Sequence, residues 1–227
     1  MSLTLYSRYL NSAGERVRIA LGLKGIDYEY IPVDTIGWAA YFEINPQGLL
    51  PAMKIDDTIV AQSTAILEYL EEQFPETPLL PADPILRAQA RGFAQHIVSE
   101  MHAIDVIRVR RFLHQDLGID QTGIDRWQRH WLARGFVALE EQLARRPEPW
   151  PFCFGEDPGW ADIHLIPQVR KGTGRFGMDL APYPLISAIH ARCTVVPAFE
   201  AASTQRQPDY PGAIAEPDIT STRPGMG

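Results

Sequence analysis

Cysteine is scarce in this sequence, which has only Cys153 and Cys193 among its 227 residues. Two cysteines are too few for a disulfide framework or for a zinc site built from cysteine ligands, so we expect no metal centre. The sequence also lacks an apolar run of the ~20 residues that a membrane-spanning helix needs. Its first residues lack the basic stretch and apolar core of a signal peptide. These absences predict a cytoplasmic protein with no membrane partner.

Positive charge is also in short supply. Lysine and arginine together number 21, against 28 aspartate and glutamate residues, which gives a formal net charge of −7. Nucleic-acid binding requires clustered cations that neutralise phosphates, and we interpret the local cluster of Arg108, Arg110 and Arg111 as a solvated helix face. We therefore expect no nucleic-acid partner. The composition, 45% hydrophobic and 22% charged, is ordinary for a globular protein.

The first third of the chain has the patterns of a small α/β domain. Residues 3–7 and 26–33 predict strands, and a helix is predicted between them over 16–24, ended by the glycine that follows. Such a βαβ unit requires parallel strands. Residues 50–55 and 58–60 predict a hairpin, and the apolar spacing of the residues after it predicts an amphipathic helix. The order, β-α-β and then β-β-α, is thioredoxin-like.

The rest of the chain has helical periodicity, over residues 85–115, 122–145, 160–171 and 184–202. The predicted class is therefore α/β plus all-α. In chain order we predict a thioredoxin-like domain (1–77), a proline-rich linker (78–84), an all-helical domain (85–206) and a disordered tail (207–227). The tail has few bulky apolar residues whose burial would offset the entropy lost on ordering.

The polar loop between the first strand and the first helix is a candidate catalytic site. Ser12 and Glu15 form an S-x-x-E capping box, which predicts that the helix begins at Ser12. The N-terminus of a helix favours anions through its free N–H groups and its dipole. It would also lower the pKa of a thiol held there. The alternative interpretation is that Ser12 only caps the helix.

Several motifs occur together in the order and at the spacing of one family. They include R-V-R-I-A-L at 16–21, N-P-Q at 45–47, L-P-A at 50–52, Q-S at 62–63, P-Q-V at 167–169 and R-Q-P-D at 206–209. In these motifs the chain resembles the zeta class of glutathione transferases, which includes the maleylacetoacetate and maleylpyruvate isomerases. The resemblance implies an N-terminal domain of order β-α-β-α-β-β-α, a C-terminal helical bundle and a homodimer.

The resemblance also implies that glutathione is the cofactor, and it identifies residues that would hold it. A cis bond between Leu50 and Pro51 would present the backbone of residue 50 to a peptide-like ligand, whereas the sequence alone also allows a trans proline at a strand edge. Ser63 suits the γ-glutamyl carboxylate, Gln62 offers an acceptor for the ammonium group, and Gln47 completes the predicted set. The alternative for Ser63 is a plain helix cap.

In this family the glutathione thiolate adds to the double bond of a cis-enone acid, the resulting single bond rotates, and elimination releases the trans isomer. By resemblance, the chain is predicted to be a glutathione-dependent cis–trans isomerase. A conjugating transferase, a thioether lyase or a dehalogenase is the alternative on the same fold. A second alternative is a protein that binds glutathione without catalysing a reaction.

The candidate loop departs from the class pattern, Arg-Ser-Ser-Cys, because this chain has Leu-Asn-Ser-Ala at 10–13. Asn11 and Ser12 are both candidates for the donor that stabilises the thiolate, since an amide N–H₂ and a hydroxyl can each donate. Leu10 stands where an arginine is expected to bind a substrate carboxylate. Arg8 is the candidate replacement, although two residues of extended chain separate the positions by about 6.6 Å.

Further substrate contacts are predicted by the same resemblance. They are Tyr9, His102, Arg108 and Arg175. An arginine at the place of Arg175 pairs with a substrate carboxylate in the isomerases, through the bidentate fork of its guanidinium. Because Arg175 is kept while the arginine at position 10 is lost, we hypothesise a small organic acid substrate that is larger or less acidic than maleylacetoacetate or maleylpyruvate.

Three aromatic residues, Trp38, Tyr41 and Phe42, fall in the short segment before residue 45. They would either line an aromatic-friendly substrate pocket or pack beneath a short helix. The sequence leaves both interpretations open.

Overall fold

The computed structural model describes residues 1–214 and 219–220, which form two compact units. The first unit comprises Met1–Pro78 together with residues 195–214. The second comprises Leu79–Thr194 and residues 219–220. Among the described residues, no helix has the length and apolar character needed to cross a membrane.

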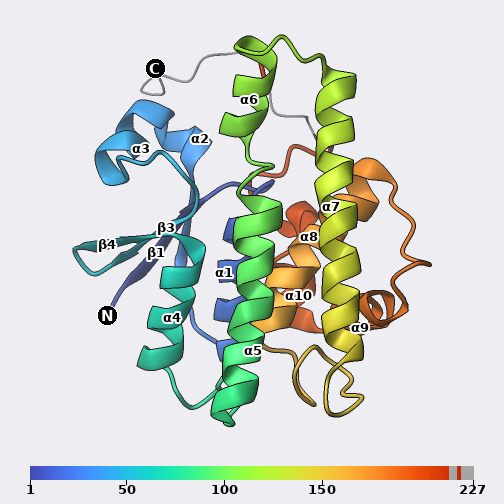
Figure 1. Cartoon of the computed structure of the whole chain (residues 1–227). Coiled ribbons are helices and arrows are strands. Elements are labelled where there is room, and N and C mark those ends of the chain that lie inside the picture. The colour runs from blue at the N-terminus through green and yellow to red at the C-terminus, as the bar shows by residue number, and fades with distance from the viewer. Residues whose placement is uncertain (215–218, 221–227) are drawn as a thin grey trace. The chain divides into compact units, whose positions relative to one another are not determined.

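A four-stranded mixed sheet forms the centre of the first unit (Figure 1). Its strands are β1 (Leu3–Ser7), β2 (Glu29–Pro32), β3 (Ala52–Ile55) and β4 (Thr58–Ala61), in the order β2-β1-β3-β4. β1 runs parallel to β2 and antiparallel to β3, and β3 and β4 form the predicted hairpin. This topology confirms the thioredoxin-like prediction. β2 is shorter than predicted because its pairing with β1 begins at Glu29, which lies opposite Thr4.

Helix α1 (Ser12–Lys24) follows β1 and ends, as predicted, at Gly25, whose φ of +65° lies in the left-handed region that glycine tolerates. The predicted start of the helix at Ser12 is confirmed, but the predicted capping box is wrong by one residue. Asn11, not Ser12, is the N-cap, because its backbone is extended (φ −150°, ψ 101°) and its side-chain oxygen accepts from the N–H of Gly14. Ser12 is already the first helical residue.

Helices α2 (Val33–Ile36) and α3 (Trp38–Ile44) pack on one face of the sheet. Side chains alternate between faces along a strand, and those that point the other way face α1 and α4 (Ser63–Gln73). Tyr41 is fully buried in a cluster with Val33 and Ala52, and the ring of Trp38 meets that of Tyr41 edge-on with 5.9 Å between centroids. The interpretation that these aromatic residues pack beneath a short helix therefore holds for Tyr41 and Trp38.

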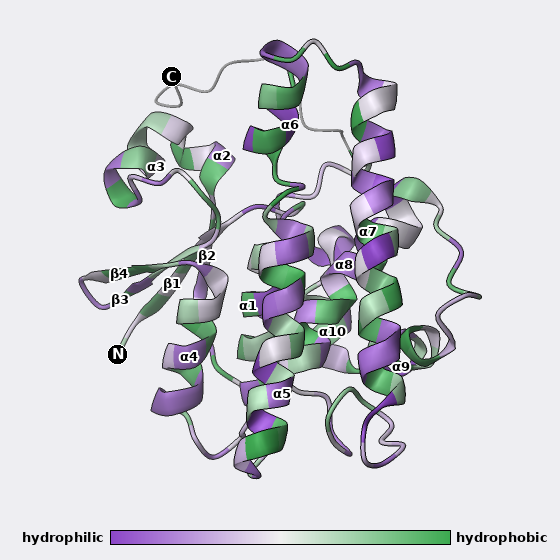
Figure 2. Ribbon diagram, viewed as in Figure 1, coloured by the Kyte–Doolittle hydropathy of each residue, from purple (hydrophilic) through white to green (hydrophobic). Residues whose placement is uncertain are grey.

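The second unit is helical, as predicted. Its helices are α5 (Pro84–Gln95), a π-helix (His96–His102), α6 (Ile107–Gln115), α7 (Gln121–Ala144), α8 (Trp160–Phe176) and α9 (Pro184–Thr194). The inward residues of α7 recur at helical spacing, among them Ile124, Leu132, Phe136 and Leu139, so that the helix carries both hydrophobic and hydrophilic residues along its length (Figure 2).

One helix predicted across residues 85–115 is interrupted in the structure. After the π-helical turn, residues 103–106 leave the regular helix, and Asp105 turns inward to accept from Gln128 and to pair with Lys171. The indole N–H of Trp127 donates to the carbonyl of Ile104 over 3.0 Å. These bonds to α7 and α8 compensate for the helical hydrogen bonds that the interruption removes.

The C-terminal region differs from the predicted division. Residues 195–206, which include α10 (Pro197–Ala201), belong with the first unit, where Ala198 lies against Gly22 of α1. Residues 207–214, predicted to be disordered, have defined positions, and the side chain of Gln207 donates to the carbonyls of Ala201 and Ser203, each over 2.9 Å. These hydrogen bonds hold the segment in place although it buries little apolar surface. Residues 215–218 and 221–227 of the predicted tail lie outside the described residues.

Candidate functional site

Three chain segments meet at one edge of the sheet in the first unit. Tyr6, at the end of β1, pairs with Ala52 at the start of β3, and Ala52 pairs with Ala61 at the end of β4. Three neighbouring strands therefore have these ends on the same side of the sheet. They are connected there to the loop after β1, to the Leu50–Pro51 bond before β3 and to the start of α4 after β4. These segments hold the predicted glutathione-binding and thiol-facing residues of this unit except Gln47, which lies three residues before Leu50.

At the first segment, Asn11 and Ser12 stand at the N-terminus of α1. The side-chain oxygen of Asn11 is occupied by the N–H of Gly14, which leaves its amide nitrogen to donate to a ligand. Gly14 permits this close cap, since a Cβ there would collide with Ser7 Oγ and lie 2.7 Å from Asn11 Oδ1. The Asn11 amide and the Ser12 hydroxyl both remain candidates for the thiolate donor.

At the second segment, the bond between Leu50 and Pro51 is cis, as the family resemblance implied. Pro51 is buried and Leu50 is half-buried beside the cluster around Tyr41. The carbonyl of Leu49, just before the bond, accepts from the hydroxyl of Tyr41 over 2.7 Å and from the side-chain amide of Asn45 over 2.8 Å. The turn that carries the bond is thus held by two side chains from α3 and its end.

At the third segment, Gln62 has a φ of +73°, which is unusual for a residue with a side chain. Backbone held in a sparsely populated region tends to occur at functional sites. The Gln62 amide donates to the side-chain oxygen of Gln47 over 2.8 Å, so the structure brings together two residues that were predicted separately. Ser63, the first residue of α4, is buried, and α4 has no side-chain cap.

Behind Ser63 lies a residue that the sequence analysis did not assign to the site. Arg16 of α1 is fully buried, and its Nη1 lies 3.4 Å from the hydroxyl oxygen of Ser63. Burial lowers the pKa of Arg16 to about 10, and the nearby charge of Glu15 opposes that change. The available signal was the position of Arg16 at the start of the largely apolar stretch R-V-R-I-A-L, because a cation buried there requires a functional or structural reason.

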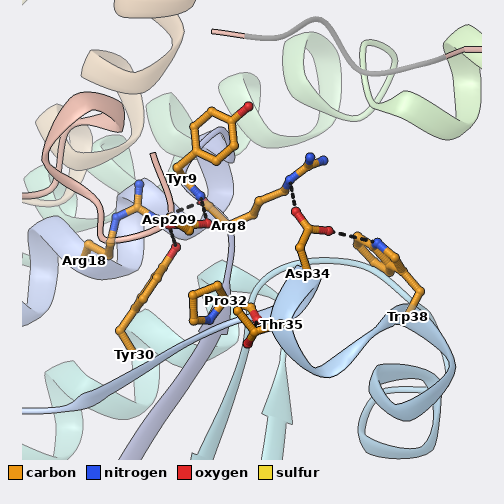
Figure 3. Close-up of polar contacts among 9 residues, drawn as sticks. All are labelled: Arg8, Tyr9, Arg18, Tyr30, Pro32, Asp34, Thr35, Trp38 and Asp209. Carbon is orange, nitrogen blue, oxygen red and sulfur yellow. Dashed lines mark hydrogen bonds and ion pairs between the residues drawn. The ribbon is translucent and has the colours of Figure 1, made fainter. Parts of the chain in front are cut away.

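Arg8 and Tyr9, the predicted substrate contacts of this unit, already have protein partners (Figure 3). Arg8 forms an ion pair with Asp34 of α2 over 2.7 Å, and Asp34 also accepts from the indole N–H of Trp38 over 3.2 Å. Tyr9 is buried, with its ring edge-on to that of Tyr210 at 5.9 Å. Arg8 therefore reaches a substrate only with the Asp34 charge beside it.

The second unit holds His102, Arg108 and Arg175. The side-chain amide of Gln168 lies 3.3 Å from Nδ1 of His102, at the end of the π-helix. Arg108 is exposed in the first turn of α6, whereas Arg110 is buried, so the interpretation of this cluster as a solvated helix face is wrong for Arg110. Arg175, in the last turn of α8, pairs with Asp125 over 3.5 Å and lies over the Phe176 ring at 4.8 Å. A cation suits the C-terminus of a helix.

Lys171 is the residue of this unit that the sequence analysis missed. It forms an ion pair with the buried carboxylate of Asp105. Burial lowers the pKa of Lys171, the charge of Asp105 opposes that change, and the charges of Arg110 and Arg175 add to it. The pair joins the interrupted helix to α8, a relationship that no local motif indicates.

Proteins already characterised resemble this chain in sequence. A family model described as the N-terminal domain of glutathione S-transferase matches residues 5–78. A maleylpyruvate isomerase from a Ralstonia species is 40% identical over 210 residues, which cover 90% of this chain and 98% of that protein.

Solved structures resemble it in fold as well. The holo structure of a maleyl pyruvate isomerase, described as a bacterial glutathione S-transferase of the zeta class, has a TM-score of 0.86 at 39% identity and covers 91% of this chain and 99% of that one. A maleylacetoacetate isomerase from Methylobacterium extorquens AM1, with malonate and glutathione bound, has a TM-score of 0.85 at 37% identity and covers 93% of this chain and all of that one (100%).

Proposed function

Because this chain belongs to the zeta class of glutathione transferases, the class of the maleylpyruvate and maleylacetoacetate isomerases, we propose that it is a glutathione-dependent cis–trans isomerase of conjugated enone acids. The observation that carries the proposal is the meeting of the Asn11–Ser12 loop, the cis Leu50–Pro51 bond and the Gln62–Ser63 turn at one sheet edge. A peptide-like thiol has a place there for its backbone, its γ-glutamyl end and its sulfur.

Four residues of this edge would hold glutathione. The backbone of Leu50 would pair with the cysteinyl residue of the ligand. The N-terminus of α4 and the hydroxyl of Ser63 would bind the γ-glutamyl carboxylate. Gln62 and Gln47, already joined by a hydrogen bond of 2.8 Å, would accept from the ammonium group through their remaining oxygen capacity.

Glutathione supplies a thiol whose reversible addition to the enone permits rotation about the former double bond. The chain's part is to stabilise negative charge on the sulfur and to orient the substrate. The Asn11 amide or the Ser12 hydroxyl would donate to the sulfur, at the positive end of the α1 dipole. His102, Arg108 and Arg175 would contact the substrate, with the guanidinium of Arg175 holding a carboxylate.

The substrate is proposed to carry one strongly held carboxylate. Arg175 is present, position 10 is leucine, and Arg8 has the Asp34 carboxylate at 2.7 Å, which offsets its charge. Tyr9 would shape the pocket through its fixed position beside Arg8. A substrate larger or less acidic than maleylpyruvate fits this balance of charges.

Turnover assays test the proposal. Purified protein and glutathione are mixed with maleylpyruvate or with a cis-enone that carries a single carboxylate, and formation of the trans isomer is followed by chromatography while total free glutathione is assayed. We expect the trans isomer to form with no net consumption of glutathione, and a higher kcat/KM for the monocarboxylate. Faster turnover of maleylpyruvate would contradict the substrate proposal, and stoichiometric loss of glutathione would contradict isomerisation.

We also propose that the chain forms a homodimer in the cytoplasm, as the family resemblance implies. Sedimentation equilibrium of the purified protein tests the first statement, with a single monomer mass as the contrary result. Fractionation of cells that produce the protein tests the second.

A further inference from the structure

Asp209 of the C-terminal segment is bonded to the loop that follows β1, although it lies 200 residues from that loop in sequence. One carboxylate oxygen, Oδ2, accepts from the backbone N–H of Tyr9 over 2.8 Å. The other, Oδ1, accepts from the hydroxyl of Tyr30 on β2 over 3.0 Å. Figure 3 shows the carboxylate between these two donors. Asp209 therefore joins the loop to the strand that runs parallel to β1.

Arg18 ties the same segment to the other side of the loop. Its side chain is buried, and Nε and Nη2 donate to the carbonyl of Ala202 over 3.1 and 3.0 Å. Its Nη1 lies 3.4 Å from both Ser7 Oγ and the carbonyl of Arg8. Burial lowers the pKa of Arg18, and the nearby charge of Asp209 is among those that oppose the change. The segment 202–210 is thus joined to the loop directly by Asp209 and indirectly by Arg18 of α1, which contacts both.

The attachment point is close to the candidate thiolate donors. Asn11 follows Tyr9 by two residues, so the place where Tyr9 is held determines where the N-cap of α1 begins. Residues 8–11 belong to no helix or strand, and the hydrogen bonds of Tyr9 N–H and Arg8 C=O go to side chains instead. A loop held in this way keeps its course only while those side chains are present.

We propose that Asp209 is a positioning residue of the thiol site, because its carboxylate fixes the loop that presents Asn11 and Ser12 to the glutathione sulfur. The inference rests on the proposed function, which places the sulfur at this loop. The carboxylate accepts from both partners, and hydrogen bonds to an ionised acceptor are stronger than those to a neutral amide. In an Asp209→Asn variant the charge is lost, so the bond from the Tyr9 N–H is weakened, and the bond to Tyr30 requires its hydroxyl to turn and accept from the N–H₂ group.

The direct readout is the pKa of the thiol of bound glutathione, measured from the ultraviolet absorbance of the thiolate as a function of pH. For Asp209→Asn we expect this pKa to rise by about one unit. At any pH below both pKa values, the fraction of bound glutathione present as thiolate then falls about tenfold. The Kd of glutathione should change little, because Leu50, Gln62 and Ser63 are untouched. The kcat should fall, with KM for the enone substrate nearly constant.

Two further variants separate positioning from folding. Glu200→Gln makes the same acid-to-amide change in the neighbouring helix α10, at a carboxylate that pairs with Arg206 on the surface, and should leave the thiol pKa unchanged. Tyr30→Phe removes one of the two bonds to Asp209 and keeps the Tyr9 contact, so it should raise the thiol pKa by a smaller amount. If Asp209→Asn does not fold, the thiol pKa is measured in Tyr30→Phe instead.

A lower Tm in Asp209→Asn with an unchanged thiol pKa and kcat would overturn the inference, and so would an unchanged pKa in Tyr30→Phe. Failure of the wild-type protein to bind glutathione would instead overturn the proposed function and the inference with it. A wild-type protein that binds glutathione with a thiol pKa near that of free glutathione would contradict activation by this loop.

Discussion

Nη1 of the fully buried Arg16 lies 3.4 Å from the hydroxyl oxygen of Ser63, where α4 begins. A guanidinium has only donors, so the Ser63 oxygen must accept in this contact, and its own proton points elsewhere. A ligand carboxylate at the N-terminus of α4 would accept a hydrogen bond from the Ser63 hydroxyl and would also lie near the charge of Arg16. The pair therefore links α1, which carries the candidate thiol site, to the helix that would bind the other end of glutathione.

Replacing Arg16 tests this link. We expect Arg16→Met to weaken glutathione binding by about tenfold, or about 1.4 kcal/mol, as measured by isothermal titration calorimetry. Arg16→Lys, which keeps a charge, should lose less. The analogue 4-aminobutanoyl-cysteinylglycine, which lacks the γ-glutamyl carboxylate, should bind the wild type and Arg16→Met almost equally. An equal loss of affinity for both ligands would show that Arg16 supports only the fold.

A substitution at Gly14 tests whether the close approach of Ser7 and Asn11 to α1 requires glycine at this position. A Cβ at position 14 would collide with Ser7 Oγ and lie 2.7 Å from Asn11 Oδ1, so Gly14→Ala should lower the free energy of unfolding by roughly 1–3 kcal/mol. Gly92→Ala, in α5, meets no atom within 4 Å and should raise it by roughly 0.5–1 kcal/mol. Urea unfolding measures both. Equal effects of the two substitutions would refute the close approach.

Asp34 tests whether Arg8 faces the substrate. Asp34→Asn removes the partner of Arg8, so kcat/KM should rise more for the dicarboxylate maleylpyruvate than for a monocarboxylate enone. Because the pair is partly exposed, with 28% of the Arg8 side chain and 43% of the Asp34 side chain accessible, stability should change by less than about 1 kcal/mol. Asp57→Asn makes the same change of net charge at the exposed partner of Lys54. Identical behaviour of the two variants would place Arg8 away from the substrate.

The burial of His190 should make the free energy of unfolding sensitive to acid. Burial and the nearby charge of Arg170 both lower the pKa of His190 below its usual 6.5. As pH falls below 6.5, the unfolded chain takes up a proton before the folded protein does, so stability is lost through that interval and is fully present above it. His190→Gln should lose less stability between pH 8 and pH 5 than the wild type. His130→Gln, on exposed α7 surface, is the control. A parallel decline in all three proteins would contradict the prediction.

The local sequence determined most of the secondary structure. The Leu3–Ser7 strand, the stop of α1 at Gly25, the β3–β4 hairpin and the helical second half were all predicted, because alternation, helical spacing and glycine conformation act over a few residues. The glutathione family was also recognisable, since its motifs are short and their spacing is maintained. The N-cap was placed one residue late because Ser and Asn both suit that position, and only the structure shows that the Gly14 N–H donates to Asn11.

What only the tertiary structure decided is how distant residues meet. Arg16 and Ser63 are 47 residues apart, Tyr30 and Asp209 are 179 apart, and Tyr9 and Asp209 are 200 apart. Composition predicted that the residues after 206 could not order, since they bury little apolar surface. Asp209 and Gln207 are held instead by hydrogen bonds to groups elsewhere in the first unit. Local propensity describes the conformation of each segment, whereas the partners of a buried charge or carboxylate exist only after the segments have packed together.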